Sequence, residues 1–116
     1  MNPAQIDLQQ LRIKHILYKS KVRSALYGGS YDPEFFSPAG PVNQWFSSIG
    51  LVKYPTEAEI RELNQIQTDL NTSVKYLTDL YSSGKIDQAF DGLSKIESQS
   101  DRFLHLVTQL EAKMGK

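Results

Sequence analysis

Residues 56–81 read TEAEIRELNQIQTDLNTSVKYLTDLY, and the periodicity of this segment indicates the fold class. Its stripe residues follow one another at steps that average close to the coiled-coil repeat: Ile60, Leu63, Gln67, Leu70, Val74, Leu77 and Tyr81. Pro55 and Thr56 open the segment, and Thr56 with Glu59 matches a capping box. Gly84 marks its end. We expect a long amphipathic helix here, with one face buried against other helices.

Two further segments have the same design. Residues 6–26 carry a stripe that falls on one side of a helix: Leu8, Leu11, His15, Tyr18, Val22, Ala25 and Leu26. A helix from about Ile86 to Met114 carries the other stripe: Ala89, Leu93, Ile96, Ser100, Phe103, Val107, Leu110 and Met114. Gly28 and Gly29 end the first of these helices, because glycine adopts the left-handed cap conformation without steric cost.

The connection Tyr27–Gly40 is long for a compact domain and is interrupted by glycine and proline. It also contains three aromatic residues: Tyr31, Phe35 and Phe36. Because a loose polar linker would not need these side chains, we expect them to hold the connection against the helices.

A short helix is predicted next, with Gly40 as its N-cap and Pro41 as its first residue, running through Trp45 to about Ile49. No alternation of apolar and polar residues is long enough to indicate a strand. Three long helices and one short helix predict an all-α, antiparallel four-helix bundle that forms a single domain over residues 1–116.

The composition excludes several classes of protein. The chain has 116 residues, with 13 Lys and Arg against 13 Asp and Glu, and no Cys. The absence of cysteine excludes disulfides and thiolate chemistry, and the balanced charge argues against bulk attraction to nucleic acid or anionic membranes. No apolar run is long enough to insert in a membrane, and no signal peptide is readable. We expect a small, soluble, cytoplasmic domain.

A second, shorter apolar strip lies on nearly the opposite side of the first helix, at Ile6, Ile13 and Leu17. In a domain of this size the free energy gained by burying apolar side chains is similar in magnitude to the cost in conformational entropy, so a lone monomer is expected to be only marginally stable. The strip is a natural surface for a homodimer, and it could equally receive the short helix.

The first helix contains five basic residues and only one acidic residue, Asp7. The basic residues are Arg12, Lys14, Lys19, Lys21 and Arg23. On a helical wheel they flank the buried stripe and do not form one face. Because no aromatic residues are interleaved with them for stacking, we expect no nucleic-acid binding.

Enzymatic motifs find no support in this sequence, and no cofactor is indicated. Ser83-Gly84-Lys85 resembles part of a phosphate-binding loop, but Asp79 and Ile86 stand where that motif needs Gly and Ser or Thr. No nucleophile elbow is present. Acids such as Glu57 lie in a first helical turn, where they complement the helix dipole. We therefore expect a protein that is not an enzyme.

Three polar residues interrupt the buried stripes or border them. His15 lies in the middle of its stripe, Gln67 lies within the next one, and Asn71 follows one turn later on its shoulder. An unpaired buried polar group costs about 1–3 kcal/mol, so we expect these side chains to meet one another or a trapped water. Carboxamides are poor zinc ligands, and a polar cluster that fixes helix register is the plain interpretation. His105 is expected at the surface.

At these residues the chain resembles the bacterial chemoreceptor zinc-binding domain family. The family's His-x-x-aromatic-Lys matches His15-Ile16-Leu17-Tyr18-Lys19, and its Cys-x-x-Gly-x-Trp aligns with Gly40-Pro41-Val42-Asn43-Gln44-Trp45. Its His-x-x-x-His aligns with Gln67 and Asn71. The similarity runs over roughly residues 5–112.

The resemblance implies the bundle fold, dimerisation and a cytoplasmic role in chemotaxis and signal transduction. Family members are attached to chemoreceptors or to cyclic-di-GMP-synthesising diguanylate cyclases, and this chain would be part of such a receptor or would dock on one. Of the four zinc ligands only His15 is present, so we expect a vestigial pocket without metal. In this pocket His15, Gln67 and Asn71 converge, and Trp45 closes it. The residues of the vestigial pocket are His15, Gly40, Trp45, Gln67 and Asn71. The alternatives are a structural adaptor and a degenerate zinc sensor that uses His15 with carboxylates.

Overall fold

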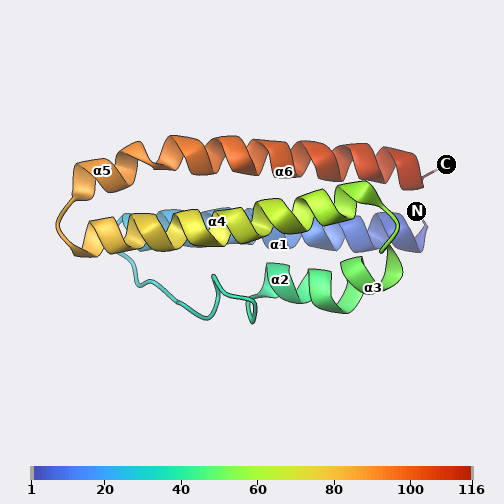
Figure 1. Ribbon diagram of the computed structural model, residues 1–116, viewed down its shortest axis with the longest axis horizontal. Coiled ribbons are helices and arrows are strands. Elements are labelled where there is room, and N and C mark those ends of the chain that lie inside the picture. The colour runs from blue at the N-terminus through green and yellow to red at the C-terminus, as the bar shows by residue number, and fades with distance from the viewer. Residues whose placement is uncertain (1, 116) are drawn as a thin grey trace.

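The computed structural model describes residues 2–115, and within them every regular element is a helix (Figure 1). The elements are α1 (Pro3–Leu26), α2 (Pro41–Trp45), a π-helical turn η1 (Phe46–Gly50), α3 (Leu51–Lys53), α4 (Ala58–Ser82), α5 (Ile86–Asp91) and α6 (Leu93–Met114). The predicted all-α class is confirmed. None of the helices in this part of the chain is both long and apolar enough to cross a bilayer.

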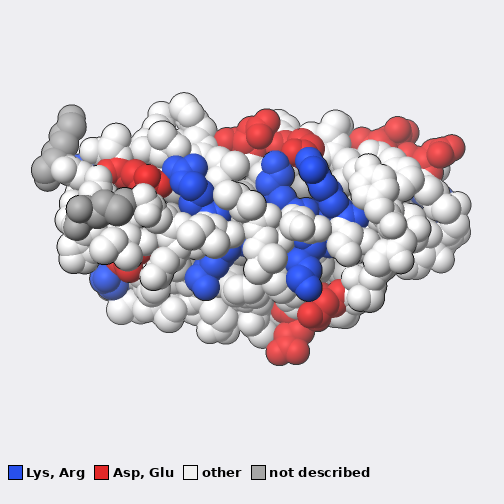
Figure 2. All heavy atoms as spheres, turned by 180° about the vertical axis from the view of Figure 1, so that it is seen from behind, with Lys and Arg blue, Asp and Glu red and all other residues white. Residues whose placement is uncertain are grey.

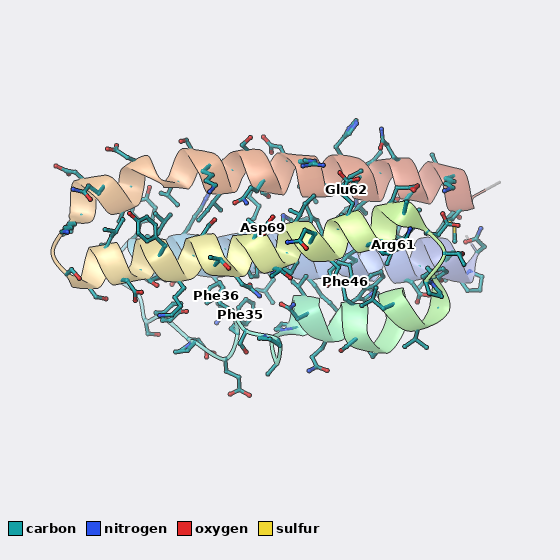
Figure 3. All side chains as sticks on the ribbon, in the orientation of Figure 1. Phe35, Phe36, Phe46, Arg61, Glu62 and Asp69 are labelled. Atoms are coloured by element: carbon teal, nitrogen blue, oxygen red, sulfur yellow. The ribbon has the colours of Figure 1, made fainter. Side chains whose placement is uncertain are left out.

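The three long helices α1, α4 and α6 lie side by side, and the arm formed by α2, η1 and α3 runs along them (Figure 1). The two described ends of the chain lie at the same end of this rod, which measures 49 × 23 × 21 Å. Ion pairs fix the direction of α6: Lys113 bonds Glu57, and Arg102 bonds Glu62 on the side of α4 that faces α6 (Figure 3). Because the numbers on the two helices run in opposite order, α6 is antiparallel to α4.

The buried stripes are those that the sequence predicts. In α1 the seven stripe residues are all buried, and no other α1 side chain is. The α4 stripe is buried from Ile60 to Leu77, with Ile66 and Thr78 added to it and Tyr81 only half-buried. The hydrophobic core therefore runs along the axis of the three long helices.

The connection between α1 and α2 is held by its aromatic residues, as predicted. The Phe36 ring is buried, lies 5.4 Å from the Tyr31 ring in a stack, and meets the Tyr18 ring edge-on at 5.1 Å. Phe35 and Phe36 both extend from the connection toward the long helices (Figure 3). Gly28, which follows α1, has φ of 95°, a conformation that favours glycine.

Gly40 is the N-cap of α2 and Pro41 is its first residue, as the sequence predicts. A Cβ atom at Gly40 would lie only 2.0 Å from the backbone oxygen of Phe35. Glycine is therefore required here by the close approach of the connection to the start of α2. The helical arm continues beyond the predicted end near Ile49 and reaches Lys53.

Two local predictions are wrong. The capping box at Thr56 does not form: Glu57 is the N-cap of α4, and its side chain makes no capping hydrogen bond. The last helix is also divided, because α5 ends at Asp91 and α6 begins at Leu93. Gly92 lies between them, and a Cβ there would meet Leu77 of α4 at 2.2 Å, so glycine lets the chain bend against α4.

Candidate functional site

A cluster of polar side chains lies inside the bundle at mid-length, contributed by four different elements. We call it the polar cluster, and it consists of His15, Tyr18, Asn43, Gln67, Asn71 and Ser100. The helical period explains how it assembles. His15 and Tyr18 are three residues apart on α1, and Gln67 and Asn71 are four residues apart on α4, so each pair projects from one face of its helix.

His15 is fully buried between α1 and α6. Its Nε2 lies 2.7 Å from Ser100 Oγ, and its ring stacks on the Phe103 ring at 4.2 Å with an interplanar angle of 9°. Within residues 2–115, Nδ1 has no hydrogen-bond partner. Burial, and to a lesser extent the positive charge of Lys19, lowers the pKa of His15 from 6.5 to about 4. His15 is therefore neutral at physiological pH.

Asn71 is the centre of the other half of the cluster. Its Oδ1 accepts hydrogen bonds from the Tyr18 hydroxyl at 2.7 Å and from Gln67 Nε2 at 3.1 Å. Its Nδ2 donates to Asn43 Oδ1 at 2.8 Å. One amide thus joins α1, α2 and α4. Gln67 is fully buried, and among the described residues its Oε1 has no partner.

The structure brings the two predicted carboxamides, Gln67 and Asn71, into direct contact. No hydrogen bond joins His15 to either of them within residues 2–115, and the partner of its ring is Ser100. The same region therefore has two unsatisfied buried atoms, His15 Nδ1 and Gln67 Oε1. Together they represent an unmet hydrogen-bonding requirement inside the bundle.

Trp45 has its own environment beside the start of α1. Its Nε1 donates to the backbone oxygen of Asp7 at 3.0 Å, and its ring meets Phe46 edge-on at 5.1 Å. A chain of aromatic rings leads from there to the polar cluster, because Phe46 lies 6.4 Å from Phe103 and Phe103 stacks on His15. The link between Trp45 and the cluster thus runs through two phenylalanine rings.

The same region of α1 is tied to the end of the α2–α3 arm. Asp7 Oδ2 accepts hydrogen bonds from Lys53 Nζ at 2.5 Å and from the Tyr54 hydroxyl at 2.6 Å. Burial alone would raise the pKa of Asp7, but these bonds and the charge of Lys53 bring that pKa below its ordinary value. The arm is therefore anchored at Asp7 and, through Asn43, at Asn71.

A surface groove of about 390 Å³ opens next to the polar cluster. Tyr31 and Phe36 supply aromatic walls, Lys75 supplies a positive charge, and Asn71 connects the groove to the buried hydrogen bonds. Asn71 is half-buried, so it belongs to both environments. A molecule in this groove would reach the amide that holds three elements together.

The resemblance implies zinc, but the residues at these positions do not fit a zinc ion. Gly40 has no side chain, and Gln67 and Asn71 are carboxamides, which zinc binds poorly compared with thiolate, imidazole and carboxylate. The one imidazole, His15, already uses Nε2 on Ser100. In the described part of the chain no three His, Cys, Asp or Glu side chains form a group that could hold a metal ion.

Sequence reasoning missed the roles of Tyr18, Asn43 and Ser100. A signal existed for Ser100, since a small hydroxyl residue occupies a position of the buried stripe in the last helix. Asn43 is harder to find, because a five-residue helix has too little periodicity to show which side faces the core. His105 is exposed, as predicted.

Comparison of the chain with models of known protein families, with curated proteins and with solved structures gives no match. The resemblance to the chemoreceptor zinc-binding family therefore stays a prediction from the sequence.

Proposed function

We propose that this chain is a non-enzymatic regulatory module built as an antiparallel four-helix bundle without a zinc site. In this proposal a small polar molecule in the groove engages Asn71 and changes how α1, α2 and α4 pack. The change then reaches a partner through protein–protein contact. A bundle that responds to a ligand needs a polar side chain that contacts the ligand at the surface and also takes part in the buried hydrogen bonds. Only such a side chain can transmit ligand binding to the packing of the helices.

The observation that carries the proposal is the position of Asn71. It hydrogen-bonds Tyr18, Gln67 and Asn43, and it also lines the groove. A ligand that takes one of these bonds leaves a partner unsatisfied, which costs about 1–3 kcal/mol inside a protein. An energy of that size is comparable to typical coupling between two sites.

The setting of the module comes from the resemblance. It implies a cytoplasmic protein in chemotaxis or a related signalling pathway, dimeric and associated with a chemoreceptor or a diguanylate cyclase. Support for contact with a partner protein comes from the outer face of α1, where Ile13 and Leu17 are exposed and uncovered by the α2–α3 arm. The alternative that this strip receives the short helix is wrong, because Ile6, Ile13 and Leu17 are all exposed.

The proposal is tested by removing the central amides and following the outer face of α1. Gln67→Leu with Asn71→Leu is expected to keep the fold with a lower free energy of unfolding, because the apolar core is retained while Tyr18 and Asn43 lose their hydrogen-bond partner. Hydrogen exchange measured along α1 is expected to change by at least several-fold in residues 10–24, since Tyr18 loses its partner on α4.

The matched control is Gln65→Ala with Asp69→Ala. These residues are also four apart on α4 and share a hydrogen bond of 3.1 Å, but both are exposed. The control is expected to leave exchange in α1 unchanged. If the double leucine variant also left α1 unchanged, the cluster would only fix register and the chain would be a structural adaptor. Stoichiometric zinc in protein purified without chelator would instead favour the degenerate sensor.

A further inference from the structure

An apolar strip runs along the outer side of α1, opposite the buried stripe. We call it the α1 strip, and it consists of Ile6, Ile13, Ile16 and Leu17, which are 46%, 67%, 54% and 47% exposed. The other exposed large apolar side chains in residues 2–115 are scattered over several elements, whereas these four share one helix face. A contiguous exposed patch of this kind marks an interaction site.

The spacing of the α1 strip fits an added helix. Ile6 and Ile13 are seven residues apart, and Ile16 and Leu17 follow three and four residues later, which is the pattern of a coiled-coil seam. The next seam position, Ser20, is small and lets a partner backbone approach. Beside it lies a groove of about 290 Å³ between α1 and α6, which can receive side chains from a partner.

The charge around the α1 strip is strongly positive. Five cations flank the strip, and two carboxylates of α6 face them: Arg12 pairs with Glu111, and Glu97 is shared between Lys19 and Arg23. The remaining two cations, Lys14 and Lys21, pair with no acid among residues 2–115. Figure 2 shows Lys and Arg on both sides of an uncharged strip on this face.

This charge distinguishes between the candidate occupants. A second copy of the chain would bring a face with the same excess of positive charge against itself, because a twofold interface uses the same patch twice. An interfacial helix on a lipid surface carries Trp, Phe or Leu on its apolar face. The α1 strip has Leu17 but neither Trp nor Phe, and the groove beside it is concave, a shape that fits the side chains of a helix better than a flat lipid surface.

We infer that the α1 strip is the docking site for one amphipathic helix of a partner protein, whose apolar stripe is flanked by Asp and Glu. The inference rests on the proposed function, since it names the chemistry of the partner through which the module acts. The partner's apolar side chains cover Ile13, Ile16 and Leu17, and its carboxylates face Lys14 and Lys21. Such helix-in-groove recognition combines apolar anchors with charge at the rim.

The probe is a synthetic helical peptide of roughly three heptads, with Leu at positions a and d and Glu at e and g. The matched peptide carries Lys in place of Glu. Fluorescence anisotropy is expected to show binding of the Glu peptide at least tenfold tighter than of the Lys peptide, with the difference reduced at high salt. Ile13→Ser with Leu17→Ser is expected to weaken binding of the Glu peptide at least tenfold.

Two further variants sharpen the test. Lys14→Glu with Lys21→Glu is expected to reverse the preference between the peptides. Val52→Ser with Tyr76→Ser removes equally exposed apolar side chains elsewhere and is expected to leave binding unchanged. None of these side chains is buried, so the variants are expected to fold.

Three outcomes would overturn the inference: equal binding of the two peptides, a dimer of the full chain that Ile13→Ser with Leu17→Ser abolishes, or binding to phosphatidylserine vesicles but not to the Glu peptide. The dimer would make a second copy the occupant, and the vesicle result would make it a lipid surface. Failure of the proposed function is separate, because it shows as unchanged exchange in the Gln67→Leu, Asn71→Leu variant whether or not the peptide binds.

Discussion

Replacing Phe103 by alanine is expected to lower the free energy of unfolding by about 3–5 kcal/mol. Phe103 is fully buried on α6, where its ring stacks on His15 of α1 and meets Phe46 of the α2–α3 arm. Truncation leaves a cavity at the point where three elements meet, and the rigid rings around it can collapse only partly. Equilibrium unfolding in urea measures the loss.

The matched control is Phe90→Ala on α5. Phe90 is only half-buried and packs on Tyr27 and Tyr81 at the end of the bundle, so the same change is expected to cost clearly less there. Phe103→Leu keeps most of the apolar volume and is expected to cost about 1–2 kcal/mol, mainly through lost ring stacking. Equal losses in Phe103→Ala and Phe90→Ala would show that the core is not centred on Phe103.

The long helices could be predicted because their periodicity alone reports which side is buried. In α1 the stripe from Leu8 to Leu26 is the full set of buried residues, and Gly28 ends the helix as expected. Burial of one face does not depend on the partner's identity, since any apolar neighbour satisfies it. This is why the fold class followed from the sequence.

The polar cluster could be predicted only in part, because its contacts depend on the register between helices. Because His15 and Gln67 occupy positions of the buried stripes, the sequence correctly predicts that both lie in the interior. Which atoms meet is set by how far α4 and α6 slide past α1, and periodicity does not contain that distance. Thus Ser100, rather than an amide, came to face the His15 ring.

The predictions of local backbone features were wrong for a different reason. Thr56 and Glu59 satisfy the pattern of a capping box, yet the chain turns before α4 and Glu57 takes the N-cap position. Gly92 occurs in a continuous helical pattern, and only the proximity of Leu77 on another helix explains the bend there. At Gly92 a tertiary contact thus overrides the short-range helical signal.

Lowering the pH from about 7.5 to about 4.5 is expected to reduce the free energy of unfolding by about 2–3 kcal/mol through His15 alone. The pKa of His15 is about 4 in the folded chain, against 6.5 for the ordinary side chain. Between these values the unfolded state binds more protons than the folded state. Stability is therefore fully present above about pH 6.5 and is lost as the pH falls toward 4.

The interval between about pH 7.5 and about pH 5.5 isolates this effect, and there the loss is expected to be about 1 kcal/mol. Carboxylates add little to it: hydrogen bonds from Arg23 and Lys19 hold the pKa of Glu97 below its ordinary value, so Glu97 stays ionised. The charge of Lys19 opposes protonation of His15. Urea unfolding at several pH values provides the measurement.

His15→Gln removes the titrating group and is expected to flatten the pH dependence in this interval, whatever its effect on stability at neutral pH. His105→Gln is the control, because His105 is exposed on the outer side of α6 and its replacement is expected to leave the slope intact. A steep slope that survives in His15→Gln would show that another group titrates.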